Sequence, residues 1–459
     1  MRAVDDTHAR PLPMTVSEGI AVEEGAPSPA DDQLVRAIGP FGLGATAVNS
    51  ALGAGIFVLP GLIAAILGPS AILAYLICGV AVALTLTCFI EIGSFVKRSG
   101  GTVAYIEEAF GPMMGFLAWL LYSVGFIVFS NAALANVLVD SAGFLWPGMA
   151  HGWPRAIALF ALFGALAAIN IIGVRQGLHF AVGVTIAKLL PLFFVVAGGI
   201  FLMHWRQLEW SGWPSASKLG EASLLLCFAF QGTEDALTPS GEIRDPARTV
   251  PRGMFGGIAT LILLYVALQV VSQGVLGGQL AHEQTAPLAA VGGRILGAAG
   301  RALLLGGVAI SVLGTVANAT LTTPRAFFLA AQNGMLPAAL AKVHPRFRTP
   351  HIAIVVVAAL MFILALTGEF RQLAILSSIS ILPAYLAVCL GALRLRYTRK
   401  REPGAFRAPG GPTVGILGTA MVIWLLAHST RAEMEALAAT VALGIAYYIA
   451  RRQWLLRKA

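Results

Sequence analysis

Three ionisable side chains lie within stretches of the chain that are otherwise apolar. Lys188 interrupts VGVTIAKLLPLFF, and Glu234 and Asp235 interrupt LLLCFAFQGTEDALTP. A charge at membrane depth costs roughly 2.5–3.5 kcal/mol on insertion scales, so it usually faces a cavity or a partner. A lysine in such a place can exchange a proton where it would otherwise stay cationic. Two simpler interpretations remain open. Lys188 could extend its ammonium to the membrane surface. The second segment could end at Phe230, although the roughly nine apolar residues that would remain are too few to cross the membrane.

Two glycines, Gly53 and Gly55, flank Ala54 in the middle of another apolar segment, ATAVNSALGAGIFVLP. Glycine leaves the backbone uncovered, so a helix can open here and expose N–H and C=O groups. Two interrupted helices in corresponding parts of a chain mark a substrate site near the membrane midplane. Helix N-termini suit a carboxylate and opposing carbonyls suit an ammonium, which favours an α-amino acid, although a small anion or a cation also fits this geometry. The alternative is that the small residues only let two helices pack closely.

These residues are expected to lie on membrane-spanning helices. The chain is 57% hydrophobic and only 12% charged, with a mean hydropathy of +0.80, whereas about a quarter of the residues of a soluble domain are charged. Apolar runs recur along the chain, and each is long enough to cross roughly 30 Å of hydrocarbon. We therefore expect an all-α polytopic membrane protein of about twelve spans, near 41–66, 70–96, 113–139, 154–173, 180–203, 222–240, 253–277, 302–329, 351–367, 371–395, 411–428 and 432–450.

The N-terminal segment and the cysteines carry little chemistry. Residues 1–36 are polar and rich in Pro, Asp and Glu, so we expect a disordered cytoplasmic tail and no signal peptide. All four cysteines fall within predicted spans: Cys78, Cys88, Cys227 and Cys389. A disulfide framework or a metal site is therefore not expected.

Lysine and arginine are distributed unevenly between the two sides of this topology. With the N-terminus inside, 23 of them face the cytoplasm and 7 face the outside, and Lys188 lies within a span. This asymmetry is the positive-inside pattern, which predicts that both termini are cytoplasmic. The net charge of +9 then belongs to loops that meet anionic headgroups, such as 393–407, and does not indicate nucleic-acid binding.

Four motifs occur in an order typical of one family: GAGIF at 53–57, SGGTVAYIEEAFG at 99–111, FQGTEDALTPSGEIRDPARTVPRG at 230–253 and TTPRAFFLAAQNGMLP at 322–337. With them the chain resembles bacterial amino acid permeases of the amino acid–polyamine–organocation (APC) superfamily. The resemblance implies a leucine-transporter-type fold, in which two inverted five-helix repeats are followed by two further helices and helices 1 and 6 are broken. The expected parts are the tail (1–36), helices 1–5 (37–210), helices 6–10 (211–397), and helices 11–12 with a short cytoplasmic tail (398–459).

The resemblance also implies roles for residues at the two breaks. The amides of Gly53, Ala54 and Gly55 match the Gly-small-Gly loop that holds the substrate carboxylate. Ala54 departs from the pattern, because many members place Ser or Thr there, and one hydroxyl donor is missing. The carbonyls near the substrate ammonium would come from Ala51 and Leu52. Phe228 matches the aromatic residue that closes over bound substrate, and three neighbours would line the second break: Ala229, Phe230 and Gly232.

Lys188 matches a lysine that takes the place of sodium in proton-coupled members of this fold. There it contacts carbonyls of the first span, which here would be those of Asn49 and Leu52, with Ser311 nearby. Glu234 matches a glutamate linked to gating or proton response, and a structural hydrogen bond to the open backbone is an equally good interpretation. Other intramembrane polar residues could face the pocket or bond between helices: Asn131, Asn136, Asn318, Ser377, Ser378 and Ser380.

These observations favour transport over other functions. The sequence has no HExxH, Walker A or Cys/His motif, so we expect no enzyme, no cofactor and no metal site. A channel would need short filters or rings of charge, and a sensor would usually carry a soluble output domain. We expect a secondary active transporter of an L-amino acid in the cytoplasmic membrane, by proton symport or by exchange without proton coupling, as a monomer or homodimer. Ala319 stands where arginine-exchanging relatives have an aromatic residue, which favours a neutral substrate.

Overall fold

The computed structural model describes residues 38–53, 55–96, 100–144, 146–173, 178–210, 212–238, 243–399 and 406–457. The predicted tail and Ala54 lie outside the described residues. Within them the chain is helical and contains no strand, only an isolated backbone pairing between Ile38 and Ile243. The main helices of the first half are α1 (Pro40–Ala51), α2 (Gly55–Leu67), α3 (Ile72–Gly93), α4 (Gly101–Phe110), α5 (Pro112–Trp119), η3 (Leu120–Val128), α6 (Phe129–Gly143), α7 (Gly152–Ile172) and α8 (Leu178–Gly199).

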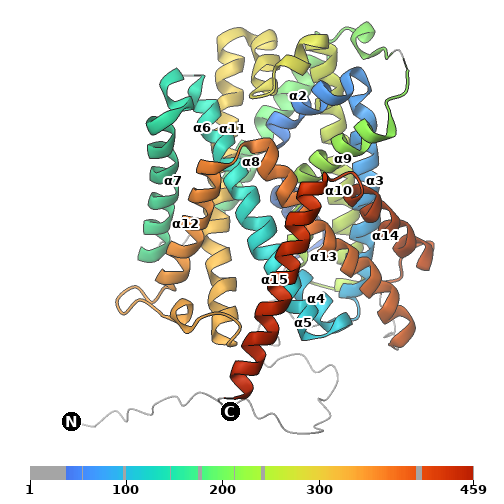
Figure 1. The fold of residues 1–459 in the computed structure, drawn as a ribbon. Helices are drawn as coiled ribbons and strands as arrows, with labels where there is room; N and C mark the ends of the chain where they lie inside the picture. The colour runs from blue at the N-terminus through green and yellow to red at the C-terminus, as the bar shows by residue number, and fades with distance from the viewer. Residues whose placement is uncertain are drawn as a thin grey trace.

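The second half continues in the same way. Its helices are α9 (Ala216–Phe230), η6 (Thr233–Leu237), α10 (Pro246–Leu276), α11 (Pro287–Gln332), α12 (His351–Thr367), α13 (Phe370–Thr398), α14 (Pro412–Leu426) and α15 (Arg431–Leu456). Short 3-10 turns connect several of them: η2 (Gly68–Ala71), η4 (Pro147–Ala150), η5 (Trp205–Leu208), η8 (Gly277–His282) and η9 (Ala338–Ala341). Figure 1 shows the long helices running side by side in one bundle, with α7 at one edge, α14 at the other and α15 across the front.

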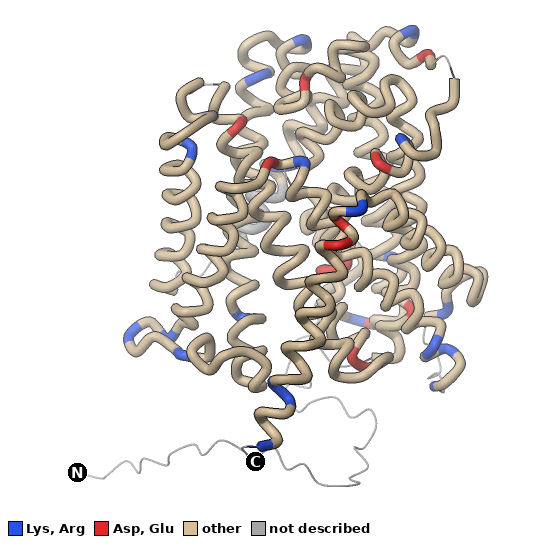
Figure 2. The backbone as a smooth tube through the Cα atoms, in the orientation of Figure 1, with Lys and Arg blue, Asp and Glu red and all other residues tan. Residues whose placement is uncertain are grey.

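Most of these helices suit a bilayer. In the described part of the chain, 7 helices are long and apolar enough to cross a membrane, and three shorter apolar helices accompany them (Ile186–Gly199, His351–Thr367 and Pro412–Leu426). Charged residues are sparse along the middle of the helices and more frequent toward their ends (Figure 2). The expectation of an all-α, multi-pass membrane protein is therefore confirmed. The finer twelve-helix inverted-repeat arrangement stays a prediction.

The predicted spans can be compared with the helices one by one. A helix, or a pair of helices around a break, lies over each of the twelve predicted ranges. The largest difference in length is at 302–329, because α11 begins fifteen positions earlier, at Pro287, and bends where Leu296 and Gly297 leave helical geometry. Gly297 has a φ of +55°, which L side chains rarely adopt. Hydropathy does not reveal this bend, since the residues on either side of it are equally apolar.

Small residues bring α1 and α10 into close contact. A Cβ atom added to Gly44 would lie 2.9 Å from the Gly253 carbonyl oxygen, and one added to Gly257 would lie 3.0 Å from the Gly44 carbonyl oxygen. Without side chains at these positions the two backbones can approach closely, as small residues allow in membrane helices. This contact anchors the segment that ends at the first break.

A π-helix, η3, lies between α5 and α6. Its wider turn changes the direction of successive side chains, and such turns occur often at functional sites. Four of its residues, Tyr122, Ser123, Phe126 and Ile127, line the cavity described below.

Candidate functional site

Both predicted interruptions are breaks in helices. The helix α1 ends at Ala51 and α2 begins at Gly55, with Leu52 and Gly53 outside either helix. The helix α9 ends at Phe230, Gln231 is extended (φ −66°, ψ 150°) and Gly232 has a φ of +88°. That left-handed conformation suits glycine, because other residues meet a steric penalty there. The two glycine-containing segments therefore end their helices where the sequence predicted.

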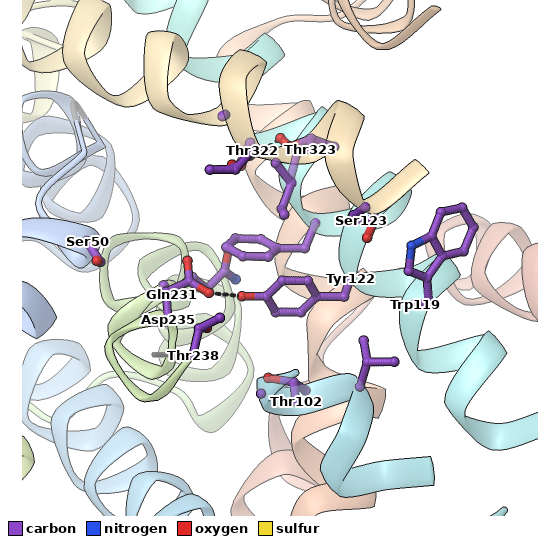
Figure 3. Close-up of a pocket in the computed structure, with 18 of the residues that line it drawn as sticks. Ser50, Thr102, Trp119, Tyr122, Ser123, Gln231, Asp235, Thr238, Thr322 and Thr323 are labelled. Atoms are coloured by element: carbon purple, nitrogen blue, oxygen red, sulfur yellow. Dashed lines mark hydrogen bonds between the residues drawn. The ribbon is translucent and has the colours of Figure 1, made fainter. Parts of the chain in front are cut away.

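One cavity of about 740 Å³ joins the two breaks. Its lining at the breaks consists of Ser50, Ala51, Gly53, Gly55, Phe228, Ala229, Gln231 and Gly232. Figure 3 shows Ser50 of α1 and Gln231, Asp235 and Thr238 near the second break facing Tyr122 and Ser123 of η3, with Thr322 and Thr323 of α11 above. Two residues that were predicted as pocket candidates, Asn131 and Asn318, also line the cavity.

The cavity continues from the breaks to one end of the bundle. Its lining there includes Gly101 and Thr102 at the start of α4, Pro112 at the start of α5, and Asn333 and Met335 just after α11. The helices α4 and α5 lie at the lower end of the bundle in Figure 1. The cavity thus leads from the middle of the bundle toward the end that carries α4 and α5.

Tyr265 of α10 links the backbones of both breaks. Its hydroxyl donates to the Ala229 carbonyl at 3.0 Å and lies 3.5 Å from the Ala51 carbonyl. Phe230 does not line the cavity, because its ring packs edge-on against Tyr265 with centroids 5.0 Å apart. The sequence analysis missed Tyr265, since a single tyrosine in the apolar run LILLYVALQV carries no sign of its contacts.

Phe228 lines the cavity near the end of α9. Its ring lies against Gly55, where an added Cβ atom would come within 2.7 Å of the ring. The ring also packs edge-on against Phe370, with centroids 5.5 Å apart. Phe370 begins α13 beside Gly368, whose carbonyl accepts a 2.6 Å hydrogen bond from the Asn136 side chain. These contacts bring α9, α2, α6 and the start of α13 together above the breaks.

The remaining polar candidates tie helices together. The Gln231 amide donates to the Ser378 hydroxyl at 2.8 Å, and the Ser377 hydroxyl lies 3.2 Å from Gln231 Oε1 and 3.3 Å from the Phe126 carbonyl. Ser377 therefore fixes Gln231 from behind and is not part of the lining. Asn131 donates to the Ile127 carbonyl at 2.8 Å, while its buried Oδ1 has no hydrogen-bond partner in the described part of the chain.

Lys188 is buried, with 4% of its surface exposed. Its Nζ donates to the Leu52 carbonyl at 3.3 Å, as the family resemblance implied, and to the Thr315 hydroxyl at 3.1 Å. Ser311 lies in the same group, 3.4 Å from the Leu52 carbonyl. Asn49 is not a partner of Lys188, and its Oδ1 is buried without a hydrogen-bond partner among the described residues. Thr315 occupies the place expected for Asn49, and the sequence analysis did not name it.

The two neighbouring carboxylates of η6 have different surroundings. Glu234 is buried and accepts a 2.9 Å hydrogen bond from the Tyr385 hydroxyl of α13. Asp235 lines the cavity and is exposed to it, and its carboxylate accepts a hydrogen bond from Tyr122 (Figure 3). The pair was noticed in the sequence, but only the structure shows which member faces the cavity.

Ion pairs hold the ends of the bundle. Arg155 of α7 pairs with Asp140 of α6 and donates to Asn136 Oδ1 at 2.8 Å, at the end opposite α4 and α5. At the other end, Arg396 of α13 lies 3.6 Å from Glu91 of α3, an ion pair between two helices.

Comparison with known proteins identifies the family. The model of the amino acid permease family matches residues 38–432. The chain is 27% identical to the serine/threonine exchanger SteT of Bacillus subtilis, over 91% of this chain and 96% of that protein. It is 26% identical to the methylthioribose transporter of that species (86% and 88%) and 23% identical to its branched-chain amino acid permease BcaP (87% and 90%). These relatives are transporters and not enzymes, and the chain therefore belongs to the amino acid permease family, as a membrane transporter of the APC superfamily.

Proposed function

We propose that this protein carries a neutral L-amino acid across the cytoplasmic membrane by proton-coupled symport and alternating access. The observation that carries this proposal is the meeting of two broken helices at one cavity. At each break, backbone N–H and C=O groups lose their partners within the helix and can bind a substrate at membrane depth. The relatives named above support an amino acid as the substrate class, because two of the three are named for amino acids.

The substrate carboxylate would lie at the N-terminus of α2. The first N–H groups of a helix have no partner within it and carry a partial positive charge, and those of α2 begin at Gly55 on the cavity wall. The ammonium would lie near the end of α1, where Ser50 and Ala51 line the cavity. The Leu52 carbonyl is already held by Lys188 and Ser311, so its part in substrate binding is indirect.

The lining around the substrate side chain favours a neutral group. The wall is largely apolar, and its polar groups are mostly hydroxyls and amides, among them Ser123, Ser130, Thr323 and Asn318. The acidic residue of η6 that faces the cavity, Asp235, is engaged by the Tyr122 hydroxyl. A small neutral side chain can hydrogen-bond to this wall, whereas a guanidinium would require Asp235 to leave its partner.

Alternating access would follow from a leucine-transporter-type fold with repeats at 37–210 and 211–397. The contact of Phe228 with Phe370 would close the outer side. With both termini in the cytoplasm, as the distribution of Lys and Arg predicts, the end with α4 and α5 faces inward, and the cavity is accessible from the cytoplasm. Lys188 would couple the cycle to protons, because it lies between α1, α8 and α11 and no ion pair holds it within the described part of the chain.

A second candidate is an amino acid exchanger without proton coupling. One relative, SteT, is named an exchanger. In this case the hydrogen bonds of Lys188 to Leu52 and Thr315 would serve only to join α8, α1 and α11.

A thermal-shift screen of the purified protein against the twenty amino acids tests substrate binding. A ligand that binds the folded state raises the melting temperature, by an amount set by its concentration relative to Kd. We expect neutral amino acids to raise it and Arg, Lys, Asp and Glu to leave it unchanged. The Gly55→Leu variant should still insert and fold, with a lower melting temperature because its side chain meets Phe228, and should show no shift on addition of substrate. Shifts that persist in Gly55→Leu would place the substrate elsewhere, and the absence of any shift with the wild type would refute an amino acid ligand.

A further inference from the structure

We propose that Thr315 relays the proton between Lys188 and the cavity, an inference that rests on the proton coupling proposed above. Lys188 is buried and is not among the residues that line the cavity in the described part of the chain. A proton that leaves its ammonium must therefore pass through a neighbouring group before it reaches water.

Only one of the two recorded partners of Lys188 can pass a proton on. The Leu52 carbonyl has no hydrogen to give, and Leu52 is buried, with 1% of the residue's surface exposed. The Thr315 hydroxyl accepts from Lys188 Nζ at 3.1 Å, and Thr315 lines the cavity. A hydroxyl is both an acceptor and a donor. In the described part of the chain, Thr315 therefore links Lys188 to the cavity.

The relay balances as a concerted transfer. The Thr315 oxygen accepts a proton from Lys188 Nζ while its own hydroxyl proton passes to a cavity water. One N–H bond and one O–H bond break, a new O–H bond forms on Thr315, and the water becomes hydronium. Lys188 is left as a neutral amine. Rotation of the hydroxyl restores the starting arrangement, and the reverse sequence loads the lysine.

Other titratable groups near the breaks are engaged elsewhere. On α10, which packs beside α8, the Tyr265 hydroxyl bonds to the Ala229 carbonyl. On α11, the other neighbour of α8, Arg325 donates to the Leu321 carbonyl of its own helix. The two carboxylates of η6, Glu234 and Asp235, accept hydrogen bonds from Tyr385 and Tyr122. Among the described residues, none of these groups contacts Lys188, which leaves Thr315 to carry its proton.

The test compares net uptake with substrate counterflow in proteoliposomes. Counterflow exchanges labelled for unlabelled substrate and needs no net release of protons. Uptake driven by a pH gradient requires net proton release. Thr315→Val keeps the shape of the side chain but removes the hydroxyl. We expect it to lower pH-driven uptake about tenfold or more, since positioned proton-transfer groups contribute roughly 10²–10⁴-fold, and to lower counterflow by a clearly smaller factor. Thr315→Ser, which keeps a hydroxyl, should retain pH-driven uptake.

A matched control removes a threonine hydroxyl from the outer surface of α10. Thr260→Val loses only a hydrogen bond to the Gly256 carbonyl of its own helix and should behave as wild type. Undiminished pH-driven uptake in Thr315→Val would overturn the relay, and so would equal losses of uptake and counterflow, which indicate a structural role. A wild type that ignores the pH gradient would instead refute proton coupling itself, so the two failures can be told apart.

Discussion

Gly55→Ala is a small change with a large predicted effect. The new Cβ atom would lie 2.7 Å and 2.8 Å from two carbons of the Phe228 ring, where ordinary contacts are 3.4–4 Å. The ring must therefore retreat by roughly 1 Å, and overpacking of this kind costs about 1–3 kcal/mol. That cost corresponds to a factor of roughly 5 to 150 in the population of the state shown here. Because Phe228 also packs on Phe370, the strain falls on the contact that we propose closes the outer side of the cavity.

A neighbouring glycine provides the control for this prediction. A Cβ atom on Gly53 would meet Leu134 at 3.6 Å, an ordinary contact, so Gly53→Ala should retain most activity. We expect Gly55→Ala to reduce substrate uptake at least fivefold with normal insertion and monodispersity, and Gly55→Ala combined with Phe228→Leu to recover part of it. Wild-type uptake by Gly55→Ala, or equal losses in the two alanine variants, would refute the steric argument.

Other predictions concern the contacts around the breaks. Phe228→Ala should lower transport strongly and affinity moderately, measured by uptake and by substrate titration, and wild-type flux would show that closure depends on other residues. Tyr265→Phe leaves the buried Ala229 carbonyl without its donor, at a cost of about 1–3 kcal/mol; we expect weaker substrate binding, and unchanged binding would contradict a role in holding the breaks. Asn136→Ala removes the hydrogen bond to the Gly368 carbonyl and should lower the melting temperature, and an unchanged melting curve would count against this contact.

The positions of the breaks could be predicted from sequence, whereas their partners could not. Gly53 and Gly55 interrupt an apolar run, and Glu234 and Asp235 bring charge into another. Both signals are local, because they concern backbone freedom and the cost of burial. The breaks then appear in the structure at Leu52–Gly53 and at Gln231–Gly232.

Partners across helices depend on how each helix is rotated, and helices that are apolar all round carry no periodic mark of their rotation. Tyr265, Thr315 and Tyr122 therefore could not be identified in advance. The same limit explains why Asn49 was expected beside Lys188 and Thr315 is found there. For Ser377 the sequence left open a pocket position or a hydrogen bond between helices, and the structure shows hydrogen bonds to Gln231 and to the Phe126 carbonyl.

The most direct test of the proposed mechanism is substrate uptake into proteoliposomes under an imposed pH gradient. We expect uptake that is driven by an inward proton gradient and is unchanged when choline replaces sodium. In Lys188→Ala we expect the response to pH to be lost. Uptake that requires sodium would contradict the placement of Lys188, and sodium-independent exchange that ignores the pH gradient would show that the protein is an exchanger in which Lys188 only joins helices.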